Sequence, residues 1–448
     1  MAHIALIITG LTGRLHSSFK LATKLQSEGH SIIYLCPQNV REKVVKHGFD
    51  YVQLSPINFG YKHSTLKNIQ SSSWVKRFVY HYKNYFNHYE IGKKVLGLEV
   101  YKAELKKVKP DHFIIDVELH DLIFAASALN IPVTLFTAWF SNNMGLGLKL
   151  PPLRTNIIPG NGIKGSSLGI LASWLFIKFK VQARILVNKL TFKDYRRKVL
   201  RKFAKENNFP TNTLIESNLP YLFCYTNLPI LSFTLSEMDF PHKPAKNHIY
   251  VGPMIYEKRD FNFDVKSIHL IDEIINEKQM TNKKLIYFSV GSILVPDIDF
   301  VKKIIKSIEE EKNWLLIVSL GGKLPIDTFK PQTNCFFIPW VPQLKVLEHT
   351  DCAIVHGGIN TISECLHYAV PMLAYSANVA EGNGNAARIH YHKLGIMGDK
   401  INDSSKEIRE HINKILNDKT YKNNLNTLNS IYRKYEEKTL SEHLNTKC

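Results

Sequence analysis

The chain has 448 residues, of which 44% are hydrophobic, 11% aromatic and 22% charged. This balance excludes a disordered or fibrous protein, and the length allows two or three domains. Lysine and arginine number 58 against 39 acidic residues, which gives a formal net charge of +19. Such a charge favours anionic partners, such as a nucleotide diphosphate or an acidic membrane face, but no nucleic-acid-binding motif accompanies it.

The start of the chain and its cysteines indicate a cytoplasmic protein. Residues 1–8 have no basic segment before their apolar run, which is typical of a first strand rather than a signal peptide. The six cysteines form no C-x-x-C pair and no zinc-type cluster, so free thiols in a reducing compartment are expected. The longest apolar stretch, Leu168 to Ile177, is about half as long as a membrane-spanning helix needs.

Strand-like and helix-like segments alternate in the first half of the chain. Strands are expected at Ile4–Thr9, Ser31–Cys36, Asp111–Val117 and Ile131–Phe136, and helices at Ser17–Glu28 and around Leu122–Leu129. The strands are unbroken apolar runs, which predicts a parallel sheet covered by helices on both faces.

The same alternation restarts after a proline-containing stretch, Leu235–Pro253. Here strands are expected at Leu285–Val290, Trp314–Leu320, Cys335–Trp340, Cys352–Val355 and Met372–Tyr375, and helices at Phe300–Glu311, Ile359–His367 and Asn385–Lys393. The fold class is therefore α/β, with two Rossmann-like domains at 1–235 and 251–425. We predict a linker at 236–250 and a helical tail at 426–448.

One turn in the second half has the pattern of an anion-binding site. Cys352–Val355 is a predicted strand, and Gly357 and Gly358 follow it, where missing side chains allow close backbone approach. A helix is expected to begin at Asn360 or Thr361. Because the first N–H groups of a helix are unpaired and the helix dipole is positive there, this arrangement favours a pyrophosphate.

Three side chains around this turn suit the rest of a nucleotide. His356 can add a hydrogen-bond donor to a phosphate, and Glu364 can accept hydrogen bonds from a ribose diol. Trp340, at the end of another predicted strand, offers a flat surface for a base. Each residue alone is weak support, because most tryptophans are core residues and most Gly-Gly pairs are simple turns.

The ordered combination resembles the signature of glycosyltransferase family 1, which includes UDP-glycosyltransferases and the macrolide and zeaxanthin glycosyltransferases. The order W-x-P-Q, H, H-x-G-x-N-[ST], E, P and D-Q-x-x-N-A is matched between Trp340 and Arg388, with Glu381 in place of the aspartate. The resemblance implies a GT-B fold, in which two Rossmann-like domains face each other across a cleft. It places the nucleotide-sugar donor in the second domain and the acceptor in the first.

The resemblance also implies the roles of individual residues. The implied donor-binding residues are Gly291 and Ser292 at the phosphates, Trp340 stacked on uracil with Val341 and Gln343 nearby, Glu364 at the ribose, His356, Gly358, Asn360 and Thr361 at the diphosphate, and Glu381 at the sugar hydroxyls. Gly382 stands where the family has glutamine, so one contact with the sugar is lost and the identity of the sugar stays open.

Sugar transfer with inversion needs a base that removes the proton of the acceptor hydroxyl. In the family this base is a histidine after the first strand, oriented by an aspartate at the end of a later strand. Asp116 matches that aspartate, but Arg14 stands at the histidine position. An arginine does not accept a proton near neutral pH, because its pKa exceeds about 12.

Three interpretations of the catalytic residues therefore compete. His16, two residues beyond Arg14, is the first candidate base, and Asp116 or Asp121 is the second. In the third, the protein binds the donor with weak catalysis or none. We hypothesise that His16 and Asp116 are both needed for transfer, because they lie near adjacent strand ends of one predicted sheet.

A metal ion and a separate cofactor are not expected. Asp297-Ile-Asp299 spells a D-x-D string that binds metal in a different glycosyltransferase architecture, but it follows Pro296 and opens a predicted helix. Aspartate at that place is an ordinary helix cap. The UDP-sugar would then act as a co-substrate without a metal.

Two other enzyme classes also use Rossmann-like domains. A nicotinamide dehydrogenase is excluded, because Gly10-Leu-Thr-Gly13 is not G-x-G-x-x-G and the second strand lacks the ribose-binding acid. A sugar-nucleotide epimerase of the same fold remains an alternative. The expected function is transfer of a hexose from a UDP-sugar to a small-molecule hydroxyl compound. The aromatic, apolar regions 59–101 and 165–192 favour a lipophilic acceptor. Residues 167–187 are typical of a packed domain helix, and a wall of the acceptor pocket or a peripheral membrane contact are the alternatives.

Overall fold

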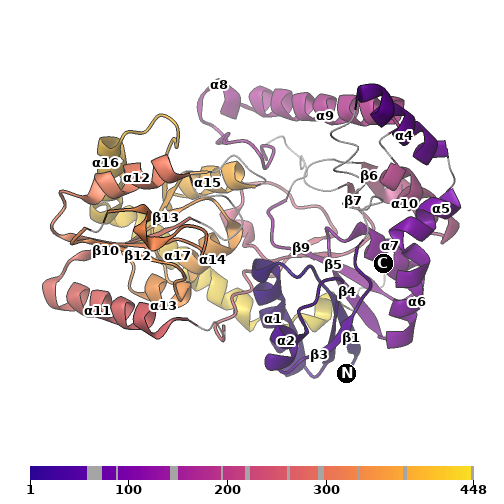
Figure 1. Ribbon diagram of the computed structural model, residues 1–448, viewed down its shortest axis with the longest axis horizontal. Coiled ribbons are helices and arrows are strands. Elements are labelled where there is room, and N and C mark those ends of the chain that lie inside the picture. Colours follow the sequence, from indigo (N-terminus) through magenta and orange to yellow (C-terminus); the bar gives the residue numbers. More distant parts are fainter. Residues whose placement is uncertain are drawn as a thin grey trace.

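The computed structural model describes residues 1–57, 73–86, 89–141, 150–192, 195–216, 222–259, 263–290, 297–330, 332–376 and 381–444. It contains two α/β domains, each built on a parallel sheet, as Figure 1 shows. The predicted fold class, with two Rossmann-like domains, is confirmed.

The first sheet has seven strands in the order β3-β2-β1-β4-β5-β8-β9, and the paired strands are parallel. They are β1 (His3–Ile7), β2 (Ser31–Cys36), β3 (Asp50–Gln53), β4 (His112–Asp116), β5 (Val133–Thr137), β8 (Ile230–Ser232) and β9 (His248–Tyr250). Strands β4 and β5 are buried along their whole length, as expected for a sheet with both faces covered.

The helices of this domain are α1 (Thr12–Ser27), α2 (Arg41–Lys46), α4 (Trp74–Phe86), α5 (Tyr89–Leu96), α6 (Leu98–Val108), α7 (His120–Ser127), α8 (Gly162–Gly165), α9 (Ser167–Leu190) and α10 (Tyr195–Glu206). A small antiparallel pair, β6 (Leu214–Glu216) and β7 (Phe223–Tyr225), lies beside α10. Figure 1 shows α9 as a long helix along one side of the molecule, with α4 near its C-terminal end.

The second sheet has six strands in the order β12-β11-β10-β13-β14-β15. They are β10 (Lys284–Ser289), β11 (Trp314–Ser319), β12 (Cys335–Ile338), β13 (Cys352–Val355), β14 (Met372–Ala374) and β15 (Gly395–Met397). The helices around it are α11 (Val265–Thr281), α12 (Ile298–Ile308), α13 (Gln343–Glu348), α14 (Ile359–His367), α15 (Gly382–Tyr391), α16 (Ser405–Asn417) and α17 (Lys419–Glu437).

Both sheets have a point where the strand order reverses. In the first sheet β1 lies between β2 and β4, and in the second β10 lies between β11 and β13. Ligands of open α/β sheets bind at the carboxyl ends of the strands at such a point. The loops after β1 and β4, and those after β10 and β13, are therefore the places where a site is expected.

The first domain extends into the segment predicted as a linker, 236–250. Strand β9 lies in that segment and pairs in parallel with β8, so His248–Tyr250 completes the first sheet. A strand of three residues at a sheet edge is too short to show a periodic pattern in the sequence. The prolines of the segment, Pro241 and Pro244, lie in the loop before it.

The end of the chain packs against the first domain. A helical tail was predicted over 426–448, and helix α17 ends within that range, at Glu437. Residues 445–448 lie outside the described part. The carboxylate of Glu28 accepts hydrogen bonds from the backbone N–H groups of Leu440 and Ser441, both at 2.8 Å. Leu440 and Leu444 are buried in the first domain's core.

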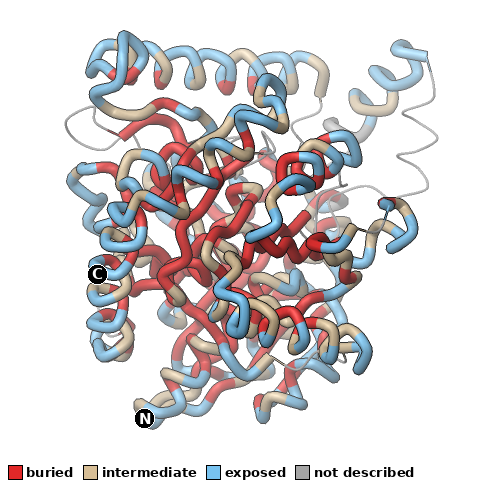
Figure 2. Tube along the Cα trace, turned by 90° about the vertical axis from the view of Figure 1, so that its left-hand side faces the viewer, coloured by how far each residue is buried: buried red, intermediate tan, exposed pale blue. Residues whose placement is uncertain are grey.

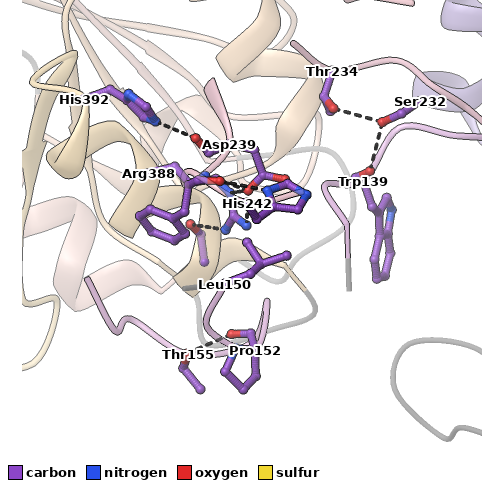
Figure 3. Close-up of polar contacts among 12 residues, drawn as sticks. Trp139, Leu150, Pro152, Thr155, Ser232, Thr234, Asp239, His242, Arg388 and His392 are labelled. Atoms are coloured by element: carbon purple, nitrogen blue, oxygen red, sulfur yellow. Dashed lines mark hydrogen bonds and ion pairs between the residues drawn. The ribbon is translucent and has the colours of Figure 1, made fainter. Parts of the chain in front are cut away.

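A buried ion pair ties the loop between β8 and β9 of the first domain to the second domain. The Arg388 side chain on α15 donates from Nε and Nη2 to Oδ1 of Asp239, at 2.8 and 2.6 Å (Figure 3). Its guanidinium lies 4.6 and 4.5 Å from the ring centroids of Phe140 and Phe240. Tyr250 donates a hydrogen bond to the other carboxylate oxygen. The pair therefore joins three separate parts of the chain.

Burial follows the two-domain architecture. Figure 2 shows buried residues through the interior and exposed residues mainly on the outer helices. Among the described cysteines, Cys36, Cys335, Cys352 and Cys365 are buried free thiols, and Cys224 is partly buried. Within the described residues, no helix has the length and apolar character to cross a bilayer.

Candidate functional site

The predicted glycine turn of the second domain is present and closely packed. Helix α14 spans Ile359–His367, the range that the sequence predicts, and begins directly after Gly358. Gly357 has φ of 86°, and a Cβ there would lie 2.7 Å from the carbonyl oxygen of Gly382. Only glycine suits this position, because it allows both the left-handed conformation and the close backbone approach.

The first turn of α15 lies on this glycine turn. Asn385 is fully buried, and its Nδ2 donates to the carbonyl oxygen of Gly357 at 2.8 Å. A Cβ at Gly382 would lie 2.9 Å from Oγ of Ser376 and 3.3 Å from the carbonyl oxygen of His356. The glycine at 382 therefore lets α15 pack against the turn, which gives a structural reason for the missing glutamine.

The start of α14 has the features of an anion site. Gly358 occupies the N-cap position and no side chain caps the helix there. The nine-residue helix directs its first N–H groups and the positive end of its dipole at the turn. Burial lowers the pKa of His356, a hydrogen bond with the backbone of Ser289 raises it, and the positive charge of Lys323 lowers it, with a net lowering.

Trp340 lies just after β12 and is 51% exposed. Gly322 supports the indole: its φ is 64°, and a Cβ there would lie 2.5 Å from Nε1 of Trp340. The next residue, Val341, is buried in the core that the two domains share. A large half-exposed aromatic side chain backed by the chain is suited to stacking on a flat ring.

A hydrogen-bond network surrounds Glu364 on α14. Gln343 donates to one carboxylate oxygen of Glu364, and Tyr287 donates to the amide oxygen of Gln343 at 3.0 Å. Arg259 donates from Nη2 to the other oxygen of Glu364 at 2.6 Å. The amide of Gln343 also lies 3.4 Å from Oγ1 of Thr361. The predicted residues Gln343, Thr361 and Glu364 therefore lie together.

Arg259 was missed in the sequence, because it lies in the segment between the domains and belongs to no recognisable pattern. Gly291 and Ser292, the predicted phosphate residues after β10, lie outside the described residues. Strand β10 itself runs beside β13, with Phe288 paired to Ile354, so both strands end at the same edge of the sheet.

In the first domain, α1 begins at Thr12, five residues before the predicted start. Arg14 and His16 consequently lie in its first turns. Residues two positions apart on a helix point to nearly opposite sides, about 200° apart. The two side chains therefore serve different surroundings, which the sequence had not indicated.

Arg14 takes the side that faces the carboxylates. Its Nη2 donates to Oε1 of Glu118 at 2.6 Å, and its Nε lies 3.7 Å from Oδ2 of Asp116. The guanidinium also lies 6.0 Å from the ring centroid of Trp139. Arg14 is buried, whereas the side chain of Glu118 is 33% exposed. Glu118 was not predicted, although it follows Asp116 by two residues at the end of β4.

Asp116 is fully buried, and burial raises the pKa of its carboxyl to about 6. The negative charge of Glu118 also raises this pKa, whereas Arg14 lowers it. The backbone N–H of Glu118 donates to Oδ1 of Asp116 at 3.1 Å. Asp121, the other candidate carboxylate, is buried on α7 and forms an ion pair with Arg196.

His16 has positively charged or basic groups around it. Burial lowers the pKa of His16 to about 3, and the charges of Arg259, His47 and Lys43 lower it further. The imidazole is therefore neutral at pH 7, and its basicity is weak. That His16 and Asp116 are both needed for sugar transfer stays a prediction.

Charges from both domains act on Glu381, which precedes α15. Burial raises the pKa of Glu381, while the positive charges of Arg14 and Arg154 lower it and the negative charge of Glu118 raises it. Nearby, a Cβ at Gly13 would lie 2.2 Å from Nδ2 of Asn360. The first turns of α1 and α14 are thus in close approach across the domain boundary.

The D-x-D string caps a helix, as the sequence predicts. Oδ1 of Asp297 accepts a hydrogen bond from the backbone N–H of Phe300 at 3.2 Å, at the start of α12. Lys400 pairs with the same carboxylate at 2.9 Å. Across the described ranges, no group of three or more His, Cys, Asp or Glu residues is arranged to hold a metal ion.

More than half of the chain matches a family of known proteins. A family model described as UDP-glucoronosyl and UDP-glucosyl transferase matches residues 187–441. The uncharacterized UDP-glucosyltransferase YdhE of Bacillus subtilis is 31% identical over 129 residues, which are 28% of this chain and 29% of that protein. The zeaxanthin glucosyltransferase of Pantoea ananas is 26% identical over 186 residues, 40% of each chain. The matches thus span less than half the length of these relatives.

Solved structures agree with the whole architecture. The glycotransferase of kitacinnamycin superposes with a TM-score of 0.66 at 18% identity, covering 99% of this chain and 97% of that one. The calicheamicin glycosyltransferase CalG4 superposes with a TM-score of 0.63 at 15% identity, covering 99% and 98%. These likenesses confirm the predicted GT-B fold. Because the family model covers more than half of the sequence, the chain belongs to the UDP-glucoronosyl and UDP-glucosyl transferase family.

Proposed function

We propose that this protein transfers a hexose from a UDP-sugar to a hydroxyl of a lipophilic small molecule, with inversion and without a metal ion. One observation carries the proposal: the uncapped start of α14 lies in close approach to the first turn of α1, through Asn360 and Gly13. A diphosphate at α14 would hold its sugar at the boundary near Arg14 and Glu118, which contact each other and whose charges act on Glu381.

The donor would extend along the end of the second sheet. Its uracil stacks on the half-exposed Trp340, and its ribose hydroxyls bind Glu364 after Arg259 leaves that carboxylate. The diphosphate binds the glycine turn and the N–H groups of α14, with His356 as a further donor. The sugar hydroxyls then reach Glu381, which lies at the start of α15.

For the base, the geometry favours the carboxylates over His16. In our proposal Glu118 accepts the proton of the acceptor hydroxyl while the oxygen attacks the anomeric carbon. The bond to the diphosphate breaks, and UDP leaves with the electron pair, stabilised by the start of α14. Arg14 orients Glu118 through the 2.6 Å contact, and Asp116 balances the charge of the arginine.

The acceptor is proposed to be lipophilic because of the helices that surround this side of the first domain. Helices α4 and α9 carry many exposed apolar and aromatic side chains. The relative from Pantoea ananas is named for zeaxanthin, and zeaxanthin is a lipophilic hydroxyl compound. An acceptor of this class would bind on the first-domain side of Arg14 and Glu118.

Two linked measurements test the proposed function. Thermal unfolding with UDP-sugars, and with NAD as a control, reports donor binding, because a ligand of the folded state raises stability by about 2.7 kcal/mol at 100 times its Kd. Release of UDP with hydroxylated lipophilic compounds then reports transfer. Trp340→Ala should abolish the thermal shift, since it removes a half-exposed ring. No shift with any UDP-sugar would overturn the proposal, and a shift without any UDP release would reject transfer.

A further inference from the structure

Helix α9 exposes a long apolar stripe to solvent. Seven of its apolar side chains are between 56% and 78% exposed, namely Leu168, Leu175, Phe176, Phe179, Leu186, Val187 and Leu190. At about 100° per residue, they fall within an arc of about 120°. The buried residues of the helix, Ile170, Trp174, Val181 and Ile185, lie on the opposite side. The helix therefore packs with one apolar face and presents a second one to solvent.

Positive charges border this stripe. The helix contains Lys178, Lys180, Arg184 and Lys189 and no acidic residue between Ser167 and Leu190. By the same helical spacing, Lys180 and Arg184 lie along one edge of the stripe, and Lys178 and Lys189 along the other. Nζ of Lys180 lies 4.4 Å from the ring centroid of Phe176, so its stem covers apolar surface.

Helix α4 extends the same surface. Trp74, Val75, Phe78, Val79 and Tyr82 are all exposed apolar or aromatic side chains of α4. The ring of Phe192, just beyond α9, lies 5.5 Å from that of Phe78 and 5.1 Å from that of Tyr82. Like α9, α4 carries basic residues and no acidic residue. We call the exposed stripe of α9 and these five residues of α4 the α9–α4 face.

We propose that the α9–α4 face docks on the surface of an anionic lipid bilayer, with α9 lying along the headgroups. Charge complementarity selects this partner, because the basic borders match lipid phosphates while the apolar stripe enters the boundary of the acyl chains. Two copies of the face would bring like charges together, and the whole chain carries +19. A second copy is therefore disfavoured on the same ground.

The docking face is connected to the proposed active site. Nε1 of Trp174, on the buried side of α9, donates to the carbonyl oxygen of Leu150 at 2.7 Å. In the same segment, the carbonyl oxygen of Arg154 accepts a hydrogen bond from Asn383 of α15. The positive charge of the Arg154 side chain acts on Glu381. A bilayer on α9 would thus lie on the acceptor side of the site. The proposal adds a lipid bilayer as a partner of the proposed enzyme. Docking on the bilayer does not itself require sugar transfer.

Sedimentation of the full chain with lipid vesicles tests the proposal. Without donor or acceptor, we expect binding to phosphatidylcholine vesicles that contain phosphatidylglycerol, weaker binding to phosphatidylcholine alone, and loss of binding as salt rises. No binding to the anionic vesicles at low salt would overturn the proposal. Because UDP-sugar thermal shifts are measured separately, failure here leaves the proposed function untouched.

Paired variants separate the stripe from its borders. Phe176→Asn with Phe179→Asn should lower the vesicle partition at least tenfold, and Lys180→Gln with Arg184→Gln should lower it about fivefold per residue. These side chains are exposed, so folding should be kept, as circular dichroism would check. Matched controls on α11, Val265→Asn with Met280→Asn, change residues that are 79% and 87% exposed and should bind as the unmodified chain does.

Two outcomes of these variants would contradict membrane docking. Equal vesicle binding by the chain with and without the phenylalanine substitutions would exclude the stripe as the docking surface. Size-exclusion chromatography supplies the second: a dimer that forms without lipid and disappears in the same phenylalanine variant would assign the α9–α4 face to a second copy of the chain.

Discussion

Arg259 and Glu364 form a 2.6 Å ion pair between the segment that joins the domains and the helix proposed to hold the ribose. Both side chains are largely buried, at 15% and 4% exposure. Because Gln343 donates to the other carboxylate oxygen, each oxygen of Glu364 already accepts one hydrogen bond. Ribose hydroxyls that bind this carboxylate would therefore compete with Arg259 and Gln343.

Replacing Arg259 should separate its effect on stability from its effect on donor binding. Arg259→Gln removes the charge from the pair, so we expect the ligand-free protein to lose about 1–3 kcal/mol of unfolding free energy. The ribose then meets less competition, and the thermal shift caused by UDP should grow. Differential scanning fluorimetry with and without UDP measures both. Lys258→Gln, at an exposed neighbouring position, is the control. A smaller UDP shift in Arg259→Gln would mean that Arg259 contacts the bound donor.

The base can be identified by comparing two variants. Glu118→Gln should lower kcat at least 100-fold, the usual lower range for a lost general base, while the UDP thermal shift is kept. His16→Asn should retain most of the activity, because its imidazole has a pKa of about 3. Steady-state kinetics with one acceptor gives both values. The reverse pattern, an inactive His16→Asn and an active Glu118→Gln, would return the role of base to His16.

The Arg388–Asp239 pair should contribute strongly to stability. Both side chains are fully buried, so Asp239→Asn leaves a buried guanidinium without its counter-charge, at a cost of about 3–5 kcal/mol. Urea unfolding measures the loss. Glu310→Gln is the matched control, because it removes an exposed partner of Arg409 and should cost less than about 1 kcal/mol. Similar losses in both variants would show that the buried pair has no special role.

Buried His120 should make the fold sensitive to acid. Burial, followed by the charges of Arg196 and Arg197, lowers the pKa of His120 from 6.5 to about 3. The unfolded chain binds this proton below pH 6.5 and the folded chain does not. Stability from this group is therefore complete above pH 6.5 and falls as the pH drops towards 3. At pH 5 the loss is about 2 kcal/mol.

His120→Gln should remove part of this acid sensitivity. At pH 7 the variant should be less stable than the unmodified chain, because it loses the hydrogen bonds of His120. These join Nδ1 to the hydroxyl of Tyr225 and Nε2 to the backbone N–H of Leu222. The decisive quantity is the change between pH 7 and pH 5, measured by urea unfolding. An equal change in the variant and the unmodified chain would show that His120 does not titrate in this range.

Much of the fold could be predicted from the sequence, because its central strands are long apolar runs. The glycine turn before α14 and the cluster of Gln343, Thr361 and Glu364 were also predictable, since the family signature keeps their order. The short edge strand β9 was not, because three residues show no periodicity. Nor was the early start of α1, since Gly13 suggested a break.

The carboxylate site was harder to predict for a physical reason. The position of Arg14 relative to His16 depends on where α1 begins, and a shift of the helix start changes which side chain faces Asp116. Glu118 becomes a candidate only once Arg14 is seen to contact it. Arg259 reaches Glu364 from 105 residues away in the chain, and such a contact is visible only in three dimensions.

The return of the chain end to the first domain has a consequence for the construction of hybrid enzymes. A hybrid that joins the first half of one relative to the second half of another at residue 250 would bring a foreign 438–444 segment against α1. That segment supplies the N–H groups that Glu28 binds and the leucines that enter the first core. A second junction near residue 437 would keep the last residues with the half they pack against.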